Sequence, residues 1–116
     1  MCELMSDVCV TSWFTGKPDI RNRTRSSEAY AIDRWRNCIL QHDLNGIVFH
    51  DCFSDELVAE YTTDNFTFIY DDQYLSSPHK IIDYRWFLYD RHFKDTDHER
   101  LFFTDCQDVI ITQNFF

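Results

Sequence analysis

Short apolar segments alternate along this chain with longer segments whose apolar residues recur at helical spacing. The short segments occupy residues 8–14, 46–51, 66–70 and 101–105. The longer ones occupy residues 27–42, 54–61 and 80–94. A strand that is buried on both faces reads as a continuous apolar run, because neither face meets water. The alternation therefore predicts buried strands joined by helices.

The predicted β-α-β-α-β-α-β order favours an α/β fold, and in particular a Rossmann-like three-layer α/β/α domain. Parallel strands need crossover connections, and right-handed crossovers place helices on both faces of a mostly parallel sheet. We expect four main strands and a short additional strand at residues 109–112. Residues 1–116 are expected to form a single domain, because the length suits one domain and no linker divides the chain.

Local signals predict where the helices begin and end and which of their faces meet the core. Ser27 and Ser54 are predicted N-caps, and Asn45-Gly46 ends the first helix. In the first helix, the predicted core stripe comprises Ile32, Trp35, Ile39 and Leu40. In the third helix, it comprises Ile82, Trp86, Tyr89 and Phe93.

Composition narrows the classes of protein to which this chain can belong. A net charge of −9 argues against broad nucleic-acid binding, which needs a basic face. No apolar run approaches the roughly 18–20 residues of a membrane span, and residues 1–10 lack the basic and apolar regions of a signal peptide. The five Cys residues form no CxxC pair and suit free thiols in a reducing compartment. We therefore expect a cytoplasmic protein.

Polar residues follow each predicted strand, at the edge where ligands bind in open α/β sheets. The first strand leads through Thr11 and Ser12 into a basic loop, which contains Lys17, Arg21, Arg23 and Arg25. The later strands lead into His50 and Asp51, into Asp71 and Asp72, and into Asp105 and Asp108. We expect Asp51, Asp71 and Asp105 to share one edge of the sheet. The first loop has neither a G-x-G-x-x-G nor a Walker A pattern, which argues against a Rossmann dehydrogenase and a P-loop enzyme.

The carboxylates after the fourth strand suggest a site for a divalent cation. In an extended strand, residues three apart lie ~10 Å from each other and face opposite ways, so Asp105 and Asp108 would not share a ligand. A turn at "DCQD" would let both face one point, and hard oxygen ligands suit Mg²⁺ or Mn²⁺. A zinc site built from His50, Cys52 and Cys106 is the weaker interpretation, because their spacing matches no zinc motif.

The stretch "FFTDCQDVIITQNFF" resembles a variant of the acidic DxD motif of glycosyltransferases with the GT-A fold. The preceding helix "DYRWFLYDRHF" and the opening "VTSWFTGKPD" also resemble that family. The resemblance implies the N-terminal, donor-binding half of such an enzyme, with strand order 3-2-1-4. It implies Mn²⁺ or Mg²⁺ on Asp105 and Asp108, and a nucleoside-diphosphate sugar contacted by Thr11, Ser12, Trp13, Asp51 and Arg85. The implied reaction transfers the sugar to an acceptor hydroxyl, and no catalytic base is identified.

The chain departs from the family pattern at three points. Its motif reads D-x-x-D, Phe115 stands where a Pro is usual, and the acceptor-binding half that follows the motif in the family does not follow here. We therefore expect a partial GT-A fold that is truncated at its C-terminus and inactive or weakly active alone. Self-association is expected through an apolar C-terminal edge, which includes Val109, Ile110, Ile111, Phe115 and Phe116. Two alternatives remain open: a non-catalytic nucleotide-binding module, and a flavodoxin- or receiver-like regulatory domain.

Overall fold

The computed structural model of the chain describes residues 7–16, 30–94, 100–106 and 111. Its elements follow in the order β1 (Asp7–Trp13), α1 (Tyr30–Gln41), β2 (Gly46–His50), α2 (Asp55–Tyr61), β3 (Phe66–Tyr70), α3 (Ile81–Phe93) and β4 (Arg100–Phe103). The four strands form one parallel sheet in the order β3-β2-β1-β4. The predicted α/β fold and its strand order are confirmed.

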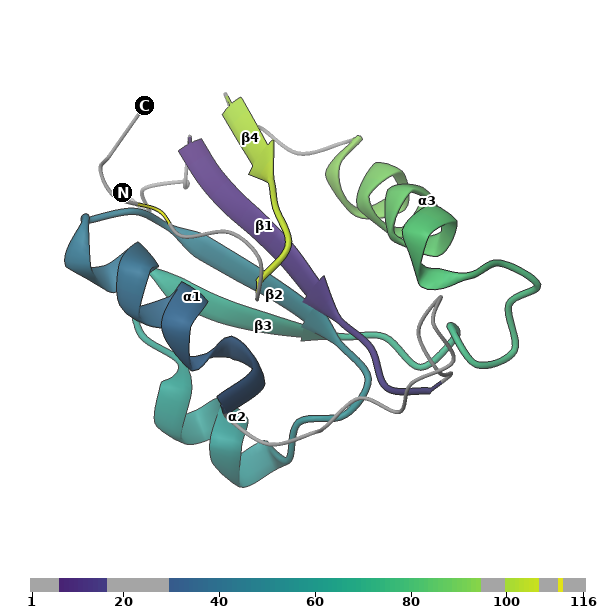
Figure 1. Ribbon diagram of the computed structural model, residues 1–116, viewed down its shortest axis with the longest axis horizontal. Helices are drawn as coiled ribbons and strands as arrows, with labels where there is room; N and C mark the ends of the chain where they lie inside the picture. Colours follow the sequence, from purple (N-terminus) through teal and green to yellow (C-terminus); the bar gives the residue numbers. More distant parts are fainter. Residues whose placement is uncertain (1–6, 17–29, 95–99, 107–110, 112–116) are drawn as a thin grey trace.

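Helices cover both faces of the sheet, so the molecule has three layers. The helices α1 and α2 lie together on one face, and α3 lies on the other (Figure 1). The central strand β2 is buried at all five of its positions, which explains why its sequence is apolar throughout. Within the described residues, no helix is both long and apolar enough to cross a membrane.

The alternation of side chains along each strand divides the core into two clusters. On the α1 side, Cys9, Trp13 and Val48 pack against Trp35, which is fully buried. On the α3 side, the core strands contribute Val8, Val10, Ile47 and Phe49. The ring of Phe49 lies 5.4 Å from that of Tyr89 and 5.9 Å from that of Phe93. Each face of the sheet therefore has its own aromatic packing.

One predicted cap is confirmed, and two predicted element ends were wrong. After α1 ends at Gln41, the residue with positive φ is Asp43, whereas Gly46 is the first residue of β2. The fourth strand ends at Phe103 rather than at residue 105.

The Ser54 hydroxyl accepts a hydrogen bond from the backbone N–H of Leu57 at 3.2 Å, so Ser54 caps α2 as predicted. The predicted cap Ser27 lies outside the described residues. Of the additional strand expected at 109–112, the structure describes Ile111, which is buried and not part of a strand.

The predicted core stripe of α3 was partly wrong. Tyr89 and Phe93 are buried as expected, but Ile82 is 48% and Trp86 49% exposed, and Tyr84 and Leu88 are buried instead. Among the strands described, the sheet ends at β4, where Trp86 contacts Phe103 with ring centroids 5.5 Å apart. Trp86 also lines a shallow groove of about 330 Å³, together with His79, Asp83 and Phe87.

The cysteines that the structure describes are free thiols, as predicted. Cys9, Cys38 and Cys106 are buried, and Cys52 is half-buried. Burial raises the pKa of the Cys9 thiol to about 12 and that of the Cys52 thiol to about 11. Both thiols are therefore protonated at neutral pH, so they pack as apolar groups and are poor nucleophiles.

Candidate functional site

All four strands run parallel, so their carboxyl ends meet at one edge of the sheet. The residues Asp51, Asp71 and Asp105 follow β2, β3 and β4 and lie at this edge, as predicted. The chain leaves β1 by way of α1 on one face, and it enters β4 from α3 on the other face (Figure 1). Because β1 and β4 are neighbours, their carboxyl ends form the topological switch point, where ligands bind in open α/β sheets.

An ion pair between Arg85 and Asp105 marks this switch point. The backbone N–H of Thr104 donates to the carbonyl of Val10 at 3.0 Å, so Asp105 lies beside the C-terminal half of β1. The Arg85 guanidinium reaches Asp105 from α3 at 2.8 Å. The Asp105 side chain is 57% exposed and that of Arg85 is 25% exposed. A cation and an accessible carboxylate therefore stand together where a ligand is expected.

The structure adds Tyr89 to this group, a residue that the sequence had predicted only as part of the core. Burial raises the pKa of Tyr89 to about 12, while hydrogen bonding with Ser12 and the charge of Arg85 oppose that rise. Tyr89 thus connects α3 to Ser12 near the end of β1. Its ring stacks on that of Phe103, with the two centroids 4.7 Å apart. The four-residue spacing of Arg85 and Tyr89 on one helix face was the signal that could have found it.

The three predicted ligand contacts from β1 do not lie together. Successive residues of a strand face opposite sides of the sheet, so Ser12 faces α3 while Thr11 and Trp13 face α1. Thr11 is fully buried, and Trp13 is 7% exposed within the core on that side. The Thr11 hydroxyl has no hydrogen-bond partner among the described residues. Of the three, Ser12 is the residue that the fold brings towards Arg85 and Asp105.

The carboxylate of Asp51 is bound to the chain that follows β1. One of its oxygens accepts from the backbone N–H of Thr15 at 2.7 Å and from the Thr15 hydroxyl at 3.3 Å. The other accepts from the backbone N–H of Gly16 at 2.8 Å. Asp51 therefore joins the ends of β1 and β2.

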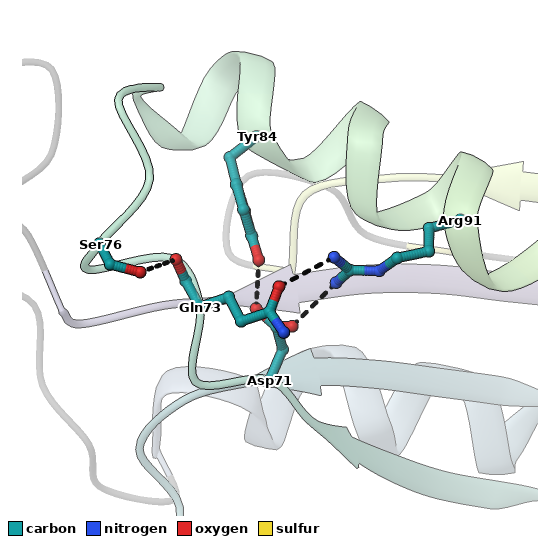
Figure 2. Close-up of polar contacts among 5 residues, drawn as sticks. All are labelled: Asp71, Gln73, Ser76, Tyr84 and Arg91. Carbon is teal, nitrogen blue, oxygen red and sulfur yellow. Dashed lines mark hydrogen bonds and ion pairs between the residues drawn. The ribbon is translucent and has the colours of Figure 1, made fainter.

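The carboxylate of Asp71 belongs to a polar network that attaches α3 to the end of β3 (Figure 2). Asp71 is 9% exposed, and it accepts hydrogen bonds from the Tyr84 hydroxyl and, at 2.9 Å, from the Arg91 guanidinium. Arg91 also donates to the Gln73 side chain at 3.1 Å. Burial, reinforced by the hydrogen bond to Asp71, raises the pKa of Tyr84 to about 12. These contacts give Asp71 a structural role.

The described residues supply one part of the predicted metal site. Asp105 offers an exposed carboxylate, whereas Asp108 and the basic residues of 17–25 lie outside the described ranges. Within those ranges, no three His, Cys, Asp or Glu side chains gather in a way that could hold a metal ion. The Nδ1 atom of His50 accepts from the backbone N–H groups of Cys52 and Phe53. The neutral ring then carries its proton on Nε2 and has no free lone pair for a metal, which argues against the zinc interpretation.

The buried His50 predicts a pH dependence of stability. His50 is 3% exposed, and burial lowers its pKa below the ordinary value of 6.5, with the charge of Asp51 opposing the shift. The unfolded chain therefore binds a proton at a higher pH than the folded chain. Stability is full above pH 6.5 and falls as the pH drops below it, by at most ~1.4 kcal/mol per pH unit.

Urea denaturation between pH 7.5 and 5.0 measures this effect against the variant His50→Asn. The Asn side chain can accept the same backbone hydrogen bonds but does not titrate, so the variant should show a shallower fall in stability over this range. Equal slopes for the two proteins would contradict the assignment to His50.

Comparison with protein-family models, with curated proteins and with solved structures gives no match for this chain. Its candidate site is therefore defined by geometry. Ser12, Arg85, Tyr89 and Asp105 meet at the switch point, and Asp51 holds the neighbouring loop.

Proposed function

We propose that this chain is the donor-binding part of a GT-A-type glycosyltransferase, which binds a nucleoside-diphosphate sugar together with Mn²⁺ or Mg²⁺. The observation that carries the proposal is the ion pair between the partly buried Arg85 and the exposed Asp105 at the switch point between β1 and β4. A diphosphate bound to an acidic chain with a net charge of −9 needs cations at the point of contact. Arg85 supplies one such charge, and a divalent cation on the carboxylates would supply the other.

The chemistry of these residues suits a diphosphate. The planar guanidinium of Arg85 can donate two parallel hydrogen bonds to phosphate oxygens, and Asp105 with Asp108 offers the hard oxygen ligands that Mg²⁺ and Mn²⁺ prefer. When bound, the metal would neutralise the charge of the leaving diphosphate. Ser12 offers a hydroxyl beside them, oriented by Tyr89. Thr11 and Trp13 would support this site from the core rather than touch the ligand.

The strand order favours this function over the flavodoxin- or receiver-like alternative. In a flavodoxin-like sheet the order is 2-1-3-4-5, so the first strand lies between the second and third. Here β1 lies between β2 and β4. A binding module without turnover would use the same site as the proposed transferase, and activity measurements distinguish the two.

Titration calorimetry with uridine and guanosine diphosphates, in Mn²⁺ and in excess chelator, tests the proposal. We expect weak binding of one of these nucleotides that depends on the metal. The variant Asp105→Asn should weaken it at least about tenfold, which corresponds to ~1.4 kcal/mol. Asp72→Asn is the matched control, because Asp72 is an exposed carboxylate at the same sheet edge and should leave affinity unchanged.

Two results would contradict the proposal. Equal binding in chelator would reject the metal, and equal losses for Asp105→Asn and Asp72→Asn would show that general charge rather than the switch point governs binding. If binding follows the expected pattern, incubation with the corresponding nucleotide sugar and an acceptor alcohol separates transfer from binding without turnover.

A further inference from the structure

We infer that Asp51 is a positioning residue for the proposed nucleotide site, and that it acts by fixing the course of the chain after β1 rather than by contacting the ligand. The inference rests on the proposed function. It replaces the direct contact that the sequence had suggested for this residue.

Both oxygens of the Asp51 carboxylate are already engaged. Two successive backbone N–H groups, those of Thr15 and Gly16, donate to different oxygens at 2.7 and 2.8 Å. Hydrogen bonds from N–H groups to an ionised carboxylate are stronger than those between neutral groups. These bonds hold the carboxylate at the backbone of residues 15 and 16, so it cannot move towards a ligand without breaking them.

The direction of this attachment matters for the switch point. In the sheet, β2 and β4 are the neighbours of β1 on its opposite sides. Asp51 follows β2, so its bonds hold residues 15 and 16 on the β2 side of β1. The Arg85–Asp105 pair lies on the β4 side. Asp51 therefore keeps residues 15 and 16 away from the switch point.

Gly16 is the second residue on which this attachment depends. A Cβ atom at this position would lie 2.8 Å from the Oδ2 atom of Asp51 and 3.5 Å from the Cβ atom of Leu75. The first distance is too short for a real contact, so a side chain here would displace the carboxylate. Gly16→Ala and Asp51→Asn should therefore disturb the same hydrogen bonds, although the alanine variant keeps the charge of Asp51.

Amide hydrogen exchange tests this attachment without any ligand. In the unsubstituted chain, the amides of Thr15 and Gly16 should exchange slowly, because both are bonded to Asp51. We expect exchange at least about tenfold faster in Asp51→Asn and in Gly16→Ala, equivalent to ~1.4 kcal/mol of lost protection. Asp72→Asn is again the control and should leave both amides protected. Unchanged protection in Asp51→Asn would overturn the inference.

The affinities for uridine or guanosine diphosphate and for its 2′,3′-dideoxy analogue, each with Mn²⁺, then separate positioning from direct contact. If Asp51 acts through the loop, Asp51→Asn weakens the binding of both nucleotides by the same factor of about ten. If Asp51 accepts a hydrogen bond from the ribose, the variant weakens the binding of the nucleotide with ribose hydroxyls alone, and the inference is wrong. If the unsubstituted chain binds no nucleotide, the proposed function fails, and the exchange rates alone decide whether Asp51 fixes the loop.

Discussion

Replacing Phe49 by alanine is expected to lower the free energy of unfolding by about 3–5 kcal/mol. Phe49 is fully buried on the central strand β2, and its ring packs edge-on or tilted against Tyr89, His92 and Phe93. The alanine would leave a cavity between the sheet and α3 that these neighbours can fill only in part. Since domains of this size are stable by only about 5–15 kcal/mol, the variant should unfold at a much lower urea concentration.

Phe87→Ala is the matched control for this result. Phe87 is the same residue type, but it is 58% exposed on α3, so its loss should change stability by no more than about 0.5 kcal/mol. The loss of stability in Phe49→Leu should lie between those of Phe49→Ala and Phe87→Ala, because leucine refills part of the cavity. Comparable midpoints of urea denaturation for Phe49→Ala and Phe87→Ala would mean that α3 does not cover the sheet in the way the structure shows.

Asp71→Ala is expected to destabilise the chain by about 2–3 kcal/mol, the loss typical of hydrogen bonds that involve a charged group. The substitution removes the acceptor of both the Tyr84 hydroxyl and the Arg91 guanidinium. Arg91 is half-exposed and can turn to water, but the buried Tyr84 hydroxyl loses its partner. Urea denaturation should record the loss, and hydrogen exchange should show it concentrated in α3, because the network joins that helix to β3 (Figure 2).

Two further variants isolate the network. Asp72→Asn changes the neighbouring exposed carboxylate and should be nearly neutral. Tyr84→Phe removes one donor but keeps the ring, so it should be less destabilising than Asp71→Ala. Combining Tyr84→Phe with Asp71→Ala should give less than the sum of the two losses, because both variants remove the same bond. Strict additivity would show that the two side chains do not interact in solution.

The order of the elements and the strand-end carboxylates could be predicted from the sequence, and the structure confirms them. Runs such as "GIVFH" are apolar at every position because β2 is buried on both faces. Once the strands are parallel, Asp51, Asp71 and Asp105 must share one edge, since each follows a strand end. These conclusions depend on local pattern and on chain connectivity, both of which the sequence carries.

The roles of the residues at that edge were decided by the tertiary structure. Periodicity shows which residues share a helix face, but it does not show how far the sheet extends beneath that face. Trp86 was therefore predicted to be core, although it lies at the margin beside β4, half exposed. Likewise, an Asp after a strand can bind a ligand, a loop or a helix. Asp51 binds a loop and Asp71 binds α3, because residues distant in sequence come within hydrogen-bonding distance only when the layers pack.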